Sequence, residues 1–352
     1  MNNLVCAATR QGFDLPVIDV SNPAFQVPDD AASLSALRAE LGESERRRKR
    51  LPRFVLRWLM RSVARRSLLA RELLGGDPGD GAVLGGMTTY MMKLGAANLV
   101  APVNTELDKR LAASPGAMSM RLRLQQLAQL LAGGLSRELA ARGPVPLHLI
   151  SIGGGTAIDC LNSLIVLRKS DPAALERRQI TLHVLDPDTE GPQFGRQALA
   201  TLAVEGNPLG GLDATFTHVA YNWNDPATLA SLVRELSSSD SVIAVSTEGA
   251  LFEYGDDQTI VSNLQALRKS SNVALVAGTV TRADPLTREF LTTSRFKLVP
   301  RAAAQFAALI ERAGFTVTQT KSTLLSDQVL LRPTRQLGEQ TSAESIHRDP
   351  NV

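Results

Sequence analysis

The most informative stretch for chemistry runs from residue 147 to residue 159 and carries three successive glycines, Gly153, Gly154 and Gly155. The glycines follow a short apolar segment typical of a strand and precede a segment typical of a helix. Glycines at such a turn let a ligand approach the backbone closely, and the start of the helix offers free N–H groups. The pattern predicts a binding loop at the carboxyl edge of a sheet, where open α/β folds hold their ligands.

A carboxylate is expected beside this loop. Asp186 ends the next apolar segment, so it should lie at the same edge and accept hydrogen bonds from a ribose diol; its structural alternative is a helix cap. The separation from Gly153 exceeds the roughly 20 residues of dinucleotide fingerprints, and Ile158 stands in place of their third glycine. A nicotinamide-dependent dehydrogenase therefore fits these residues less well.

The elements that must position these residues alternate along the second half of the chain. Strands are expected at 147–152, 180–185, 215–220, 241–245, 273–278, 315–320 and 328–331. Helices are expected at 157–168, 192–204, 226–236, 257–269 and 302–313. This alternation predicts an α/β, Rossmann-like fold with a mainly parallel seven-stranded sheet and a terminal antiparallel hairpin.

Four regions are expected along the chain. Residues 1–45 contain three prolines and little periodicity, so we expect them to be poorly ordered. Residues 46–142 carry helical patterns at 51–74, 87–99, 105–111 and 118–141, which predict a helical lid or dimerisation region. Residues 143–332 form the expected binding domain, and the polar residues 333–352 a mobile tail.

The composition is that of a globular protein. The chain has 352 residues, of which 44% are hydrophobic and 4% aromatic, and it lacks an apolar run of about 18 residues. No signal-peptide pattern begins the sequence, and Cys6 and Cys160 are too few for a disulfide framework or a thiolate metal site. We therefore expect a cytoplasmic protein without a metal.

The positive charge is concentrated in one segment. Residues 46–71 hold eleven Lys or Arg and no Asp or Glu, whereas the formal net charge of the whole chain is only +3. A basic amphipathic helix of this kind could dock on RNA or on an anionic membrane. The alternative, which we favour, is a solvated basic face on a lid or dimer helix.

The glycine loop resembles the first motif of class I S-adenosylmethionine-dependent methyltransferases. Gly153 and Gly155 match the first two glycines of that motif, and Ala157 stands at the third. Ser151 replaces the acidic residue that usually helps to fix the methionine end of the cofactor. The resemblance covers roughly residues 118–332 and implies S-adenosylmethionine as cofactor, with Gly154 also in the binding loop.

Further positions extend the resemblance. It implies that Asp186 binds the ribose hydroxyls, that Asn222 and Trp223 contact the adenine, and that Thr247 lies near the transferable methyl group. The stretch from Glu248 to residue 254 is also similar to leucine carboxyl methyltransferases and related small-molecule O-methyltransferases. In those enzymes an upstream arginine, here Arg121 or Arg123, pairs with the cofactor carboxylate.

Catalytic groups are less clearly marked. Glu248, Glu253, Tyr254 and Asp256 follow the fourth expected strand and are candidates to face the acceptor. Tyr90, with Thr88 and Lys93 on the same expected helix, could reach over the cleft. The four histidines are interpreted as structural or terminal; they are His148, His183, His218 and His347.

These observations favour methyl transfer to a small-molecule acceptor, with O-methylation ahead of N- or C-methylation, in specialised biosynthesis. No Asn/Asp-Pro-Pro-aromatic motif follows the fourth strand, and no proline precedes either cysteine, which argues against methyltransferases of nucleic-acid bases. A homodimer is the expected assembly.

Overall fold

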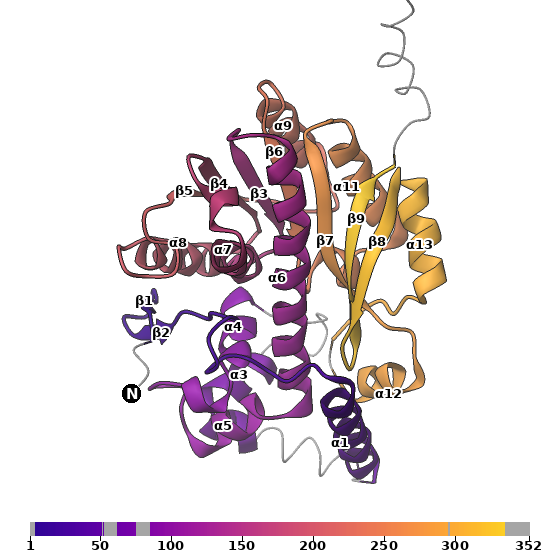
Figure 1. The fold of residues 1–352 in the computed structure, drawn as a ribbon. Helices are drawn as coiled ribbons and strands as arrows, with labels where there is room; N and C mark the ends of the chain where they lie inside the picture. The colour runs from indigo at the N-terminus through magenta and orange to yellow at the C-terminus, as the bar shows by residue number, and fades with distance from the viewer. Residues whose placement is uncertain (1–3, 51, 53–61, 75–84, 295, 335–352) are drawn as a thin grey trace, which may run out of the picture.

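The computed structural model describes residues 4–50, 52, 62–74, 85–294 and 296–334 (Figure 1). Its main sheet has seven strands in the order β5-β4-β3-β6-β7-β9-β8. The strands are β3 (Leu147–Ile152), β4 (Gln179–Leu185), β5 (Asp213–Val219), β6 (Val242–Thr247), β7 (Val273–Thr281), β8 (Phe315–Ser322) and β9 (Ser326–Pro333). The first five are parallel and β9 is antiparallel to both β7 and β8, which confirms the predicted fold class.

Helices cover both faces of this sheet. One face carries α6 (Pro115–Ala141), α7 (Ile158–Ser170) and α8 (Glu190–Leu202), whose apolar residues belong to the larger core cluster. The other face carries α9 (Ala227–Leu236), α11 (Asp257–Arg268) and α13 (Ala303–Arg312), which contribute to a second cluster. The short α10 (Leu251–Tyr254) and α12 (Pro285–Thr293) complete the domain and were not predicted.

The long helix α6 lies against the sheet and links it to the preceding helices. Ser114 caps its first turn by accepting a hydrogen bond from the backbone N–H of Ala117, and Pro115 suits the first helical position. Gly134 permits the close approach to β7, because a Cβ atom there would lie 2.8 Å from a methyl group of Leu275. The expected helix 118–141 is therefore present and begins three residues earlier.

Three further helices gather beside the lower half of α6 in Figure 1: α3 (Leu68–Leu74), α4 (Gly86–Leu94) and α5 (Glu106–Ala112). A 3-10 turn, Ala96–Asn98, lies between α4 and α5. Residues 51 and 53–61, in the middle of the basic segment 46–71 and in the first half of the expected helix 51–74, lie outside the described residues, as does the tail beyond residue 334. The docking hypothesis for that segment stays a prediction.

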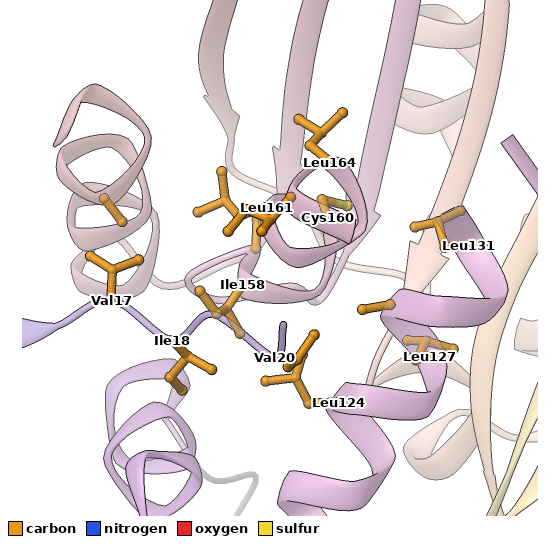
Figure 2. Packing of buried hydrophobic residues seen from close by; sticks show 14 of the residues in the cluster. Val17, Ile18, Val20, Leu124, Leu127, Leu131, Ile158, Cys160, Leu161 and Leu164 are labelled. Atoms are coloured by element: carbon orange, nitrogen blue, oxygen red, sulfur yellow. The ribbon is translucent and has the colours of Figure 1, made fainter. Parts of the chain in front are cut away.

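The N-terminal segment corrects an expectation. Residues 4–45 are not loosely placed: they form the hairpin β1 (Cys6–Ala8) and β2 (Asp14–Pro16), an extended stretch, and most of α1 (Ala31–Lys49). Val17, Ile18 and Val20 are buried in the larger core cluster, and Figure 2 shows Val20 beside Leu124 of α6 and Ile18 near Ile158 of α7. Asp30 caps α1 through hydrogen bonds from the N–H groups of residues 32 and 33.

Side-chain amides hold this extended stretch in place of a neighbouring strand. Asn162 on α7 accepts a hydrogen bond from the N–H of Val20 at 2.7 Å and donates one to the carbonyl of Ile18 at 2.9 Å. Gln125 on α6 does the same with both backbone groups of Val27. These distant partners form hydrogen bonds with backbone groups that have no partner in a neighbouring strand. The prolines and the weak periodicity therefore did not indicate disorder in this segment.

We predict that Asn162→Ala lowers the free energy of unfolding by about 2–3 kcal/mol, because two buried backbone groups lose their partners. Urea unfolding followed by circular dichroism measures the change. Asn224→Ala, at an exposed position, serves as the control and should change stability by less than about 0.5 kcal/mol. Equal stability of the two variants would contradict a fixed N-terminal segment.

Candidate functional site

The glycine loop joins β3 to α7 with an unusual backbone. Gly153 and Gly155 have φ angles of 63° and 51°, a left-handed conformation that favours glycine. Ala157, at the position of the third glycine, has a φ of 50° and so carries this conformation with a side chain. The loop predicted from the sequence is present, and its backbone bends at all three motif positions.

Asp186 lies directly beside this loop. Its Oδ2 accepts a hydrogen bond from the N–H of Gly155 at 2.8 Å, and its Oδ1 accepts one from the N–H of Asp188 at 2.9 Å. Burial raises the pKa of this carboxyl above its ordinary value, while the two N–H groups oppose the shift. Each oxygen keeps a further lone pair, so the carboxylate can still accept hydroxyl groups of a ligand.

Glycines of α4 and α8 allow both helices to approach the glycine loop closely. A Cβ atom on Gly86, the first residue of α4, would lie 2.8 Å from the Cα atom of Gly155. A Cβ atom on Gly191 of α8 would lie 3.0 Å from the same Cα atom. Three backbone segments therefore meet without side chains at this point, which the sequence analysis did not anticipate.

The other predicted cofactor residues have different surroundings. A Cβ atom at Gly153 would lie 2.7 Å from the ring of Trp223, so the indole packs on the glycine. Asn222 is exposed and its Oδ1 accepts a hydrogen bond from the N–H of Asn224, leaving the amide NH₂ group available. Thr247 is buried, and its hydroxyl accepts a hydrogen bond from the N–H of Leu251. The structure thus gathers Trp223 at the loop, whereas Thr247 braces α10.

Buried charges meet at the carboxyl end of β6. Glu248 forms ion pairs with Lys93 of α4 and with the Nε atom of Arg123 of α6. Arg123 also pairs through Nη1 with Glu253 of α10 at 3.0 Å, and Glu253 accepts a hydrogen bond from Thr281. This set of four charged side chains, which we call the ion cluster, ties two N-terminal helices to the sheet edge.

The pKa directions follow from burial and pairing. Burial alone would raise the pKa of Glu248, but Arg123 and Lys93 outweigh it and lower the pKa. Burial lowers the pKa of Lys93 despite the neighbouring Glu248. Burial raises the pKa of Glu253, with Arg123 opposing the shift. The lowered pKa and the two neighbouring cations make Glu248 poorly suited to accept a proton.

Two serines lie at this edge: Ser246, and Ser151 in place of the acidic residue of the motif. Ser246 of β6 donates a hydrogen bond to the buried carboxylate of Asp159. Ser151, which faces Ser246 in the parallel register, is buried and its hydroxyl has no partner among the described residues. No sequence signal marked the contact of Ser246 with Asp159, because it depends on how α7 packs against β6.

A cavity of about 270 Å³ lies beyond the ion cluster. Arg123, Gly249, Glu253 and Tyr254 form its wall on the side of the sheet. Its other walls come mainly from apolar side chains, including Met92, Leu111, Met120, Phe290, Leu291, Phe296, Leu298 and Leu325. Tyr254, predicted as an acceptor-facing residue, therefore does face a cavity.

Tyr90 is a correction. The sequence suggested that it reaches over the cleft, but only 1% of the residue is exposed. Its hydroxyl donates to the carbonyl of Pro16 and accepts from the N–H of Ile18, and its ring packs edge-on against Phe194. Tyr90 thus anchors the N-terminal segment, and a catalytic role does not fit this position. Lys93, expected on the same helix, is also buried rather than exposed.

The histidines in the strands have structural surroundings. His183 contacts His148 at 3.2 Å and the hydroxyl of Thr217 at 3.0 Å. Burial, and then His148, lower the pKa of His183 to about 4. His218 contacts the carbonyl of Asp186. Among the described residues, no group of three or more His, Cys, Asp or Glu side chains could hold a metal ion.

Comparisons with known proteins give similarity only among solved structures. No family model matches the chain, and no curated protein matches it significantly. Magnesium protoporphyrin IX methyltransferase from Synechocystis PCC 6803, solved with bound SAH, is 13% identical over 61% of this chain and 87% of that chain, with a TM-score of 0.40.

Two other similar structures are O-methyltransferase NcsB1 from neocarzinostatin biosynthesis and human N-acetylserotonin methyltransferase, both solved with S-adenosylmethionine. NcsB1 is 18% identical over 65% of this chain and 61% of that chain, with a TM-score of 0.35. The human enzyme is 14% identical over 60% and 56%, with a TM-score of 0.37. The matched region spans less than two thirds of both proteins. At such low identities, the function has to be argued from the residues of this chain.

No described helix is long and apolar enough to cross a membrane.

We predict that Lys93→Met lowers the free energy of unfolding by about 3–5 kcal/mol at pH 7, because a buried carboxylate loses one of its two cations. Chemical denaturation measures the loss. Adding Glu248→Gln to Lys93→Met should recover part of it, since the unpaired charge is removed. The coupling would be contradicted if Glu248→Gln lowered the free energy of unfolding of the Lys93→Met variant by as much as it lowers that of the natural chain.

A second prediction concerns pH. The pKa of His183 is about 4 in the folded chain and about 6.5 in the unfolded chain, so the unfolded chain binds an extra proton between these values. The free energy of unfolding should therefore fall by about 2 kcal/mol from pH 7 to pH 5 through this residue. Urea unfolding of His183→Gln should show a smaller fall than the natural chain; an identical fall would refute the assignment.

Proposed function

We propose that this protein is an S-adenosylmethionine-dependent methyltransferase acting on a small-molecule acceptor, with transfer to oxygen. The observation that carries the proposal is the pairing of Asp186 with the N–H of Gly155. It places a buried carboxylate and a side-chain-free loop together at the carboxyl edge of a parallel sheet. Open α/β sheets bind nucleotide-like ligands at this edge.

The residues present fit an adenosyl group. Asp186 retains lone pairs for two ribose hydroxyls, and Gly153 offers backbone without a side chain. Trp223 supplies a flat ring beside that glycine, and the free amide of Asn222 could bind a ring nitrogen of the adenine. Arg123 differs from the expectation for a cofactor-carboxylate partner, because Glu248 and Glu253 already engage its guanidinium.

The bound cofactor supplies an electrophilic methyl group. The chain orients the acceptor and keeps water away from it. The apolar walls of the cavity exclude water from an acceptor beside Gly249. Glu253 is the carboxylate that lines this cavity among the described residues, and burial raises its pKa. We assign to Glu253, rather than to Glu248, the acceptance of a proton from an acceptor hydroxyl.

The homodimer, the cytoplasmic location and the role in specialised biosynthesis remain predictions from the sequence. So does transfer to nitrogen or carbon as the alternative reaction.

The test is the affinity for S-adenosylhomocysteine, measured by isothermal titration calorimetry. Asp186→Asn should weaken binding about 10- to 100-fold, because one carboxylate oxygen becomes an NH₂ group that opposes either a backbone N–H or a ribose hydroxyl. Asp213→Asn is the matched control, since Asp213 is exposed at the opposite end of the neighbouring strand. Unchanged affinity in a folded Asp186→Asn variant, or binding of NADH instead, would refute the proposal.

A further inference from the structure

The volume and the walls of the apolar cavity indicate which kind of acceptor it can hold. At about 270 Å³ it lies just below the range of roughly 300–1,000 Å³ that is common for small-molecule sites. Methionine, leucine and phenylalanine side chains from α4, α5, α6 and α12 form most of its walls. Thioether and aromatic groups pack well against flat rings. The cavity therefore suits a compact, largely apolar molecule.

Among the described residues of the cavity wall, every ionised side chain is already paired with another side chain. Arg123 pairs with Glu248 and Glu253, which also accounts for the charge of Glu253. Arg48 pairs with Glu45 at 3.0 Å. An acceptor with a net charge would have to break one of these pairs or remain buried without a counterion, and both are costly.

The hydroxyl groups that have no hydrogen-bond partner on the described part of the wall include the buried one of Thr287 and the more accessible one of Tyr254. The side chain of Tyr254 is only partly buried, and its hydroxyl has no hydrogen-bond partner among the described residues. Burial, and then the nearby Glu253, raise the pKa of Tyr254, so the phenol stays protonated and can donate. It lies next in the chain to Glu253, and α10 presents both residues to the cavity.

We propose that the acceptor is an uncharged, compact ring compound, one hydroxyl group of which binds between Tyr254 and Glu253. This inference rests on the proposed function and narrows it. It excludes acceptors that present a carboxylate, and therefore separates this chain from the carboxyl methyltransferases that the segment 248–254 resembles. The hydroxyl proton passes to Glu253 as the oxygen forms its bond to the methyl carbon, and the electron pair of the broken sulfur–carbon bond stays on sulfur.

The experiment measures binding of two probes with the same ring system, 2-naphthol and 2-naphthoate, to the full chain saturated with S-adenosylhomocysteine. Isothermal titration calorimetry at pH 7 should give an affinity for 2-naphthol at least tenfold higher than for 2-naphthoate. Equal affinities, or tighter binding of 2-naphthoate, would overturn the proposed acceptor class.

Two variants locate the probe. Met120→Trp fills the cavity and should weaken 2-naphthol binding at least tenfold, whereas Val204→Trp, at an exposed position, should change it less than twofold. Tyr254→Phe should weaken 2-naphthol about three- to tenfold and leave naphthalene, which lacks the hydroxyl, unchanged. Full 2-naphthol affinity in a folded Met120→Trp variant would also overturn the proposal.

The same titrations distinguish failure of the acceptor class from failure of the methyltransferase function. S-adenosylhomocysteine binding by the natural chain, together with a preference for 2-naphthoate, would remove the acceptor class and leave the proposed function standing. Absence of S-adenosylhomocysteine binding would remove both, because the acceptor assignment depends on the methyl donor.

Discussion

The structure depends on one buried guanidinium. Arg123 lies between Glu248 and Glu253, and through them it joins α6 to the end of β6, to α10 and, by way of Lys93, to α4. A buried ion cluster of this kind contributes little net stability compared with apolar packing, but breaking it is expensive. Its effect here is to fix which elements meet. The helices before the sheet and the loop after β6 take one arrangement, and the cavity forms beside it.

The glycine loop and the cavity use different physical means at the same edge. At the loop, backbone N–H groups and a buried carboxylate provide directional polar contacts, and missing side chains leave room for close approach. At the cavity, apolar side chains remove water and the charges are neutralised in pairs. The ion cluster belongs to the cavity through Arg123 and Glu253, and Glu248 connects it to the end of β6.

Sequence patterns identified what local periodicity encodes. The strand 147–152 was predicted with its observed limits, and the terminal hairpin and Asp186 at the sheet edge were also predicted correctly. The failures have a common cause, which is dependence on distant partners. The N-terminal segment is ordered by Asn162 and Gln125, each more than 90 positions away along the chain. Tyr90 was assigned to the cleft because nothing in its own helix shows that Pro16 and Ile18 cover it. The paired state of Glu248 is likewise invisible until α4 and α6 are placed.

The meeting of Gly86, Gly155 and Gly191 has a consequence for how the chain can be divided. Because α4 touches the glycine loop backbone to backbone, α4 is not a separate lid that related proteins could exchange as a unit. The same contact means that α4 cannot be separated from the sheet without exposing the backbone of the glycine loop, and α6 packs against both of them.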